Sequence, residues 1–178
     1  MSAPRIAPGT LSEIGLVNDL VARACGWFAG TGRPNLFTTL AKHRPLFRGW
    51  LGFASTIMPR GTLPRRETEL AILRVAHLRA CNYEFEHHAR LGKRAGLTER
   101  DVERVKAGAD DPDWSERERA LMRAATMLHA QRDLDDATWT ALRNCMTEKE
   151  CLELVLLVGH YEMLATAIAA LRIQLDNP

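Results

Sequence analysis

Carboxylate, thiol and imidazole side chains gather in one short stretch of this 178-residue chain, at Glu69, Cys81, Glu84, His87 and His88. Glu84 and His88 are four residues apart, so on a helix they lie one turn apart on the same face, within hydrogen-bonding reach. A carboxylate beside an imidazole suits proton transfer near neutral pH. Glu84 and His88 are therefore candidate catalytic residues.

Two further groups accompany this pair. Cys81 directly precedes a helix predicted to begin near Asn82, where backbone N–H groups and the helix dipole favour a thiolate. Glu69 belongs to the preceding helix and is able to fold back onto the same face. Cys81 and Glu69 are added to the candidate catalytic residues. His87 is rotated by about 100° from His88 and is expected to be solvated or to lie at an interface.

The elements that position these residues are predicted to be helices. A hydroxyl residue precedes a carboxylate by three positions at Thr10, Thr98, Ser115 and Thr147, a spacing typical of helix N-termini. Apolar residues recur at three- and four-residue spacing, without the strict alternation of a strand. The sequence therefore predicts an all-α fold of about eight to nine helices, in a single domain over residues 1–178.

Glycine, proline and capping signals divide the chain into helices. The predicted helices lie at about Ser12 to Phe28, Pro34 to Lys42, Pro45 to Ile57, Arg65 to Arg79, from a break near Ala80 to Tyr83 up to Gly96, and then at Thr98 to Lys106, Ser115 to Gln131, Asp136 to Asn144 and Thr147 to Leu171. The candidate site lies on the pair of helices in the middle of this series.

Composition narrows the class of function. Apolar residues make up 46% of the chain, enough to bury a core without disulfides or metals. The 24 basic and 22 acidic residues are scattered, so the net charge of +2 provides no field for nucleic acid or an anionic membrane. The N-terminus lacks the apolar region of a secretory signal, and no apolar run approaches the roughly 20 residues that span a bilayer. We expect a cytoplasmic protein without nucleic-acid or membrane partners.

The cysteines are expected to be reduced thiols. They are widely spaced and include no C-x-x-C pair, which argues against a disulfide scaffold and a zinc ribbon. Glu84 and His87 have the E-x-x-H spacing of di-iron bundles, and Glu153 and His160 are the residues that could complete such a site. Only one such motif is present, so we expect no metal and no cofactor. The four cysteines are Cys25, Cys81, Cys145 and Cys151.

The stretch LPRRETELAILRVAHLRACNYEFEHHARLGKRAGL, about residues 63–97, resembles the core of carboxymuconolactone decarboxylase-like proteins of the alkylhydroperoxidase D-like (AhpD-like) superfamily. The shared features are an arginine- and glutamate-rich helix start, the ILRVA segment, a tripeptide of the YEF type, a histidine and an AGL helix end. The segments PNLFTTLAKHRPLFRGWLGF and LELVLLVGHYEMLATAIAAL resemble longer members, so the likeness covers most of the chain. The resemblance implies an AhpD-like helical bundle that assembles as a homo-oligomer, a dimer, trimer or hexamer.

The peroxidase branch of this superfamily uses a glutamate, two cysteines three apart and a histidine four residues further on. By resemblance the glutamate corresponds to Glu69, in preference to Glu67, and the first cysteine to Cys81. Glu84 occupies the position of the second cysteine, and the histidine corresponds to His88. A carboxylate forms neither a sulfenic acid nor a disulfide. The expected chemistry therefore moves from thiol redox to proton transfer.

Three functions follow. The first is a carboxymuconolactone decarboxylase-like enzyme acting on a small organic acid or lactone, with His88 as the proton donor, Glu84 orienting it and Glu69 as a second carboxylate. The second is an AhpD-like peroxidase with a single reactive Cys81. The third is a non-catalytic, ligand-binding helical oligomer. Substrate contacts are expected from Tyr83 and His160, whereas Arg65, Arg66 and Arg74 are predicted to be solvated charges, with one of them able to hold a substrate carboxylate.

Overall fold

A computed structural model describes residues 3–176, apart from the side chain of Phe28. Within this range there are ten α-helices, eight of them seven residues or longer, and no β-strand, which confirms the all-α prediction. The α-helices are α1 (Leu11–Ile14), α2 (Leu16–Ala29), α3 (Asn35–Leu40), α4 (Arg44–Ile57), α5 (Arg65–Leu78), α6 (Asn82–Arg94), α7 (Glu99–Ala107), α8 (Glu116–Gln131), α9 (Asp136–Cys145) and α10 (Glu148–Leu171), and the 3-10 helix η1 is Gly108–Asp110.

The predicted capping residues stand at the starts of their helices. Before α7, the Thr98 hydroxyl accepts a hydrogen bond from the Asp101 backbone N–H at 3.1 Å, and the Thr98 N–H donates to the Asp101 carboxylate at 2.9 Å. Ser115 and Thr147 make the same reciprocal bonds before α8 and α10. These contacts satisfy backbone donors that a helix start leaves without partners.

The first predicted helix, about Ser12 to Phe28, is wrong in one respect, because the structure divides it into α1 and α2 at Gly15. Gly15 adopts φ 80°, a left-handed conformation that ends α1. The Arg44 guanidinium donates to the carbonyl oxygen of Glu13 at 2.9 Å, so a side chain replaces the amide of a continuing helix. The apolar periodicity continues across this break and therefore did not reveal it.

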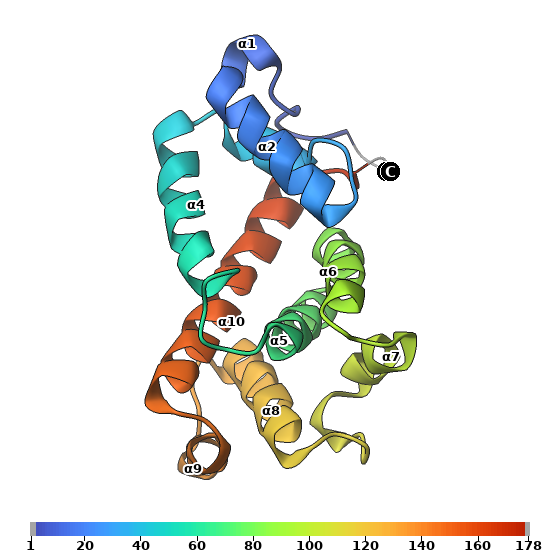
Figure 1. Cartoon of the computed structure of the whole chain (residues 1–178), viewed down its shortest axis with the longest axis vertical. Coiled ribbons are helices and arrows are strands. Elements are labelled where there is room, and N and C mark those ends of the chain that lie inside the picture. The colour runs from blue at the N-terminus through green and yellow to red at the C-terminus, as the bar shows by residue number, and fades with distance from the viewer. Residues whose placement is uncertain (1–2, 177–178) are drawn as a thin grey trace.

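Helix α5 lies at the centre of the molecule and packs against α6, α7, α8 and α10. Figure 1 shows α5 and α10 passing through the middle, with α8 below them and α6 to one side. Leu70, Ile72, Leu73 and Val75 are completely buried although they point in different directions around the helix. A helix that is buried on all sides is a core helix, so its one buried carboxylate, Glu69, is held inside the protein.

A tight turn joins α5 to α6. Ala80 adopts φ 49°, the Ala80 N–H donates to the His77 carbonyl at 3.0 Å, and the Cys81 N–H donates to the Ala76 carbonyl at 2.8 Å. This pattern is a Schellman motif, in which the chain reverses direction within two residues of the helix end. It lets α6 fold back onto α5, which brings His88 to Glu69.

Helix α10 corrects one statement about the sequence. Among the described residues, Glu148–Leu171 is the one helix long and apolar enough to cross a membrane by length and composition, with a mean hydropathy of 1.8 over 18 residues. The prediction that no apolar run approaches the length needed to span a bilayer was therefore wrong. Core helices of soluble proteins meet the same criterion, and α10 buries Leu154, Leu157 and Val158 against its neighbours. At least part of the apolar surface of α10 is therefore buried in the core.

Candidate active site

A cavity of about 430 Å³ lies between α2, α3, α4, α6 and α10 and is closed at one side by the start of α5. Four of the predicted site residues line it, namely Tyr83, Glu84, His88 and His160. All four side chains are buried. Apolar residues form most of the remaining wall, as in pockets that bind small molecules. The structure thus brings the substrate-contact and proton-transfer candidates to one cavity.

Glu69 lies behind His88 and does not line the cavity. Its Oε2 is 2.7 Å from Nδ1 of His88, and its Oε1 is 2.5 Å from Nη2 of Arg65. Both side chains of the Glu69–His88 pair are almost fully buried. Since an ionised carboxylate is an acceptor only, Nδ1 of His88 carries the proton in this contact. Glu69, and not Glu84 as predicted, therefore orients the imidazole.

Glu84 is the second ionisable group in the wall of the cavity. Its side chain is buried, and neither carboxylate oxygen has a hydrogen bond of normal geometry among the described residues, although the Cys81 thiol lies close enough to lower the pKa of Glu84. Burial raises the pKa of Glu84 to about 8, and the negative charge of Glu162 adds to the rise. At neutral pH the group is largely protonated. Glu84 can therefore donate a proton to a molecule in the cavity.

Cys81 lies outside the cavity, at the N-cap of α6. Burial, followed by the negative charge of Glu84, raises the pKa of its thiol to about 12. The predicted thiolate is therefore wrong. The dipole of the helix N-terminus does favour an anion, but the loss of hydration and the neighbouring carboxylate outweigh it. Cys81 behaves as a small buried side chain next to Glu84.

Tyr83 connects the cavity to the C-terminal segment. Its hydroxyl donates to the carboxylate of Asp176 at 2.9 Å and accepts from the Leu36 backbone N–H at 3.2 Å. The Asn35 N–H also donates to Asp176, at 2.7 Å. Burial raises the pKa of Tyr83 far above its usual range, so the phenol stays protonated. Tyr83 contributes a ring and a fixed hydroxyl to the wall.

His87 was expected at a solvated or interface position, but it lines the cavity and its side chain is 16% exposed. Its ring stacks on Tyr83, with 6.4 Å between the ring centroids. Burial lowers the pKa of His87 to about 3 and that of His160 to about 4, so both rings are neutral at physiological pH. The C-terminal segment that covers Tyr83 also covers the side of α6 that carries His87.

The three candidate arginines separate into two groups. Arg65 lines the cavity, and its Nη1 is buried without a hydrogen-bond partner among the described residues. Arg66 instead pairs with Asp101 and Glu118, and Arg74 donates to the carbonyl of Val105 and to other groups of the α7–α8 region. Arg65 is therefore the one of the three that faces a possible substrate.

The remaining carboxylates have structural partners. Glu67, the competitor of Glu69, pairs with Arg117 at 2.8 Å. Glu153 accepts hydrogen bonds from the Thr62 and Leu63 backbone N–H groups and so fixes the loop before α5. In the described part of the chain no three histidine, cysteine, aspartate or glutamate side chains converge as metal ligands would.

Several other residues of the wall were not among the predicted site residues. Trp50 and Phe37 reach the cavity from α4 and α3, and Cys25 from α2. Tyr161 packs its ring against His88, with 4.9 Å between the centroids. These positions depend on how α2, α3, α4 and α10 meet, and no spacing within one helix encodes that.

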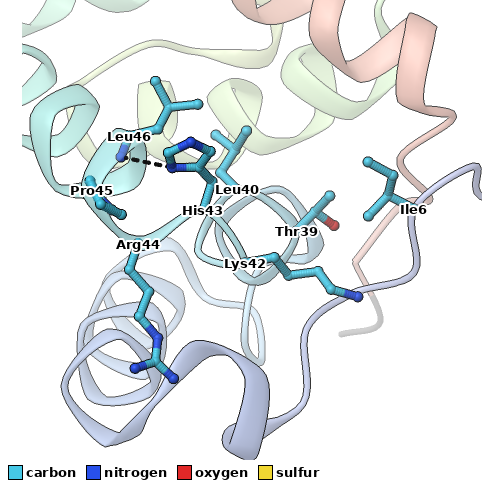
Figure 2. A pocket seen from close by; sticks show the side chains of 8 residues that line it. All are labelled: Ile6, Thr39, Leu40, Lys42, His43, Arg44, Pro45 and Leu46. Carbon is cyan, nitrogen blue, oxygen red and sulfur yellow. Dashed lines mark hydrogen bonds between the residues drawn. The ribbon is translucent and has the colours of Figure 1, made fainter.

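A second hollow, of about 640 Å³, lies between the N-terminal segment and the α3–α4 junction (Figure 2). Its basic side chains are already paired: Lys42 contacts Glu13 at 3.0 Å, and Arg44 donates to the Glu13 carbonyl. The ring of His43 accepts the Leu46 N–H and caps α4, as the dashed line in Figure 2 shows. None of the predicted site residues lines this hollow, so the candidate active site is the cavity beside α6.

Residues 44–127, just under half of the chain, match the model of the "Carboxymuconolactone decarboxylase family". This segment runs from the start of α4 into α8 and contains Glu69, Glu84 and His88. None of the curated proteins matches the chain. The segment that matches the family model thus contains these three candidate catalytic residues.

Several solved structures share the whole fold. An alkylhydroperoxidase AhpD core, a peroxidase-related protein from Ralstonia eutropha JMP134, superposes with a TM-score of 0.85 at 18% identity, over 99% of this chain and 94% of that one. The debrominase Bmp8 superposes with a TM-score of 0.77 at 20% identity, over 96% of this chain and 91% of its own. A variant of Bmp8 with a cysteine changed to alanine was solved with 2,3,4-tribromopyrrole. The chain therefore carries a carboxymuconolactone decarboxylase family segment, residues 44–127, within an AhpD-like helical fold.

Proposed function

We propose that this protein is a carboxymuconolactone decarboxylase-like enzyme that transfers a proton to or from a small organic acid or lactone in the cavity beside α6. One observation carries the proposal: Glu84 and His88 lie one turn apart on α6 and line the same buried cavity, while Glu69 holds Nδ1 of His88 from behind. An acid and an oriented imidazole in a mostly apolar cavity are the groups that acid–base catalysis needs.

The roles follow from the protonation states. Glu69 keeps the proton of His88 on Nδ1, so Nε2 is the nitrogen left to accept a proton or a hydrogen bond from substrate. Glu84, whose pKa burial raises to about 8, is the proton donor. In a decarboxylation the bond between carbon and carboxylate breaks, CO₂ leaves and the electron pair stays on a carbon next to a carbonyl. Glu84 then protonates that carbon and regains a proton from water.

The direct test is CO₂ release by the full-length protein, with carboxymuconolactone and a panel of small lactone carboxylic acids as probes. The expected result is release from at least one of them that stops when Glu84 is changed to Gln, a variant of the same size without the acidic proton. Release from none of the probes, or release unaffected by Glu84→Gln, would overturn the proposal. Circular dichroism confirms that the variant is folded.

Thiol chemistry receives less support from the geometry than proton transfer. Cys81 lies outside the cavity and its pKa is raised to about 12, so few molecules carry a thiolate near neutral pH. Because this helical fold occurs in both a peroxidase-related protein and a debrominase, the fold does not select the reaction. The residues of the cavity must decide it.

Changing Cys81 to Ser is therefore expected to alter turnover by less than about threefold. Serine keeps a small side chain at the N-cap of α6, where it is a preferred residue, so Glu84 stays in place. Mass spectrometry after peroxide treatment is the companion measurement, and an unoxidised Cys81 is expected when the more exposed thiols have reacted. Loss of turnover in Cys81→Ser, or early oxidation of Cys81, would favour a single-cysteine peroxidase.

We further propose that the protein is a homo-oligomer that uses one face of α10. Leu152, Leu156 and Met163 are 64%, 44% and 51% exposed, and Gly159 lies between them on the same face. They follow the spacing at which one helix packs along another, with no charged residue in the row. A second copy of the chain would cover this row from the outside. The cytoplasmic location stays a prediction.

Leu156→Glu is expected to reduce the oligomer to a smaller species, because it places a charge in the centre of that row. Size-exclusion chromatography with light scattering measures the mass. Trp139→Glu is the matched control, since Trp139 is 43% exposed but lies on α9. An unchanged mass for Leu156→Glu would contradict the proposed interface, as would a monomeric parent protein.

A further inference from the structure

Buried polar atoms without hydrogen-bond partners gather at the cavity beside α6. Among the described residues, five that line this cavity carry such atoms. They are Trp50 Nε1, Arg65 Nη1, both carboxylate oxygens of Glu84, His87 Nδ1 and His160 Nδ1. Nearly all buried polar groups in proteins are paired, so such a concentration at one cavity marks a place where another molecule completes the hydrogen bonds.

The rings that line the cavity form a continuous series, which we call the ring wall. Its members, in spatial order, are Trp50, His160, Tyr161, His88, His87 and Tyr83. The centroids of successive rings are between 4.9 and 6.4 Å apart, within the range in which aromatic rings attract one another. A flat, conjugated molecule can extend this series, whereas a saturated ring or chain lacks the faces and edges for it. The ring wall therefore favours planar ligands.

The charges at the cavity favour an anion. His87 and His160 are neutral because burial lowers the pKa of both rings, and Glu84 is protonated below about pH 8. Arg65 is a permanent cation that uses Nη2 for Glu69 and leaves Nη1 without a partner. The Arg65 side chain is 33% exposed, and a guanidinium with an N–H that lacks a partner is a strong donor to a carboxylate.

We infer that the substrate is a planar, conjugated carboxylic acid whose rings lie against the ring wall and whose carboxylate binds Arg65. The inference rests on the proposed function for the site and deepens it by naming the substrate class. The carboxylate held by Arg65 stays on the product. The CO₂ comes from a second carboxylate, on a carbon next to a carbonyl, and Glu84 protonates that carbon when the bond to CO₂ breaks. The cavity of about 430 Å³ suits a molecule of one or two fused rings.

Isothermal titration calorimetry with three probes of nearly equal size tests whether the cavity prefers a planar ligand and whether it prefers a carboxylate. The probes are naphthalene-2-carboxylate, the saturated decahydronaphthalene-2-carboxylate and the uncharged naphthalene-2-carboxamide. The planar acid is expected to bind about fivefold or more tightly than the saturated acid, and about tenfold or more tightly than the amide. Equal affinity for the three probes, or no binding of the planar acid, would overturn the inference.

Two variants assign the discrimination to residues. Arg65→Lys keeps a cation beside Glu69 but loses the second N–H arm, so the preference for the acid over the amide is expected to fall to about threefold or less. Trp50→Leu is expected to remove most of the preference for the planar over the saturated acid. Trp27→Leu is the control, because Trp27 is 82% exposed and does not line the cavity. Unchanged preferences in Arg65→Lys and Trp50→Leu would contradict the inference.

The same titrations in Glu84→Gln separate this inference from the proposed function. Glutamine leaves the cavity uncharged at that position, so the order of the three affinities is expected to be the same as in the parent at pH 6, where Glu84 is protonated. If Glu84→Gln keeps its turnover while the probes discriminate as expected, the proposed acid–base roles fail and the ligand class stands. If turnover is lost but the probes bind alike, the ligand class fails alone.

Discussion

His88→Ala is expected to lower turnover by at least about 100-fold, because a positioned proton-transfer group contributes about 10²–10⁴ to the rate. His88 lines the cavity and is the only group there that a buried carboxylate, Glu69, holds in one tautomer among the described residues. Removing the imidazole takes away the acceptor or donor and leaves Glu69 paired with Arg65 alone. Steady-state kinetics with the acid found by CO₂ release measures the effect.

Two companion variants and a rescue experiment make this prediction specific. Glu69→Gln is expected to cause a smaller loss, of about 10- to 100-fold, because His88 stays but its tautomer is no longer fixed. His77→Ala is the control, since His77 lies on α5 like Glu69 but its side chain is exposed. Free imidazole is expected to restore part of the turnover of His88→Ala. Turnover of a folded His88→Ala within threefold of the parent would remove His88 from the mechanism.

Local signals predicted the helices with little error. The reciprocal bonds of Thr98, Ser115 and Thr147 are contacts within four residues, so the sequence contains all that is needed to place them. The break at Gly15 was not predicted because it also depends on Arg44, whose guanidinium reaches the Glu13 carbonyl from another helix. Errors in the predicted fold therefore occur where a partner distant in sequence decides the local conformation.

The same distinction holds for the candidate site. The four-residue spacing placed Glu84 and His88 on one face of α6, and the family resemblance placed Glu69 near them. Trp50 and Arg65 could not be assigned in this way, because their contact with the cavity depends on how α4 and α5 pack against α10 and α6. A resemblance between sequences identifies residues on one segment, whereas the far wall of a cavity is a property of the packed fold.

Cys81 and His87 were misjudged for an energetic reason. Position alone favoured a thiolate at the start of α6 and a solvated imidazole one residue from His88. Burial reverses both expectations, since it raises the pKa of Cys81 and lowers that of His87. The free energy lost when a charge is removed from water exceeds the stabilisation that a helix dipole provides. The degree of burial is the quantity that the sequence did not provide.

Glu84→Gln is expected to change how stability depends on pH. The pKa of Glu84 is about 8 in the folded protein and 4.5 in an exposed chain, so between these values unfolding releases a proton. The free energy of unfolding contributed by this residue therefore falls as the pH rises from about 4.5 to 8 and is constant outside that window. The full difference is on the order of 5 kcal/mol. Glutamine has no proton to lose and is free of this penalty.

The parent must be compared with Glu84→Gln because other groups make stability change with pH in the opposite direction. His87 and His160 are neutral when folded and become protonated when unfolded below about pH 6.5, so their contribution to stability rises with pH. This contribution is the same in both proteins, so it cancels when the free energy of unfolding of the parent is subtracted from that of Glu84→Gln. Urea denaturation from pH 5 to 9 is expected to give similar stabilities near pH 5 and an increasing advantage for Glu84→Gln up to about pH 8. Glu86→Gln, at an exposed position on the same helix, should change stability by less than about 0.5 kcal/mol throughout.

The titration of Glu84 also connects stability to catalysis. If the protonated carboxyl is the proton donor, turnover of the parent falls as the pH rises through about 8, in the same range in which the stability difference stops growing. Titration of this one buried carboxyl group would then account for the pH dependence of both turnover and stability. Loss of its proton removes the acid and leaves an unpaired charge inside the protein. A stability difference that does not vary with pH would show that Glu84 is ionised in the folded state. In that case the carboxylate would serve as a base, and turnover should rise with pH instead.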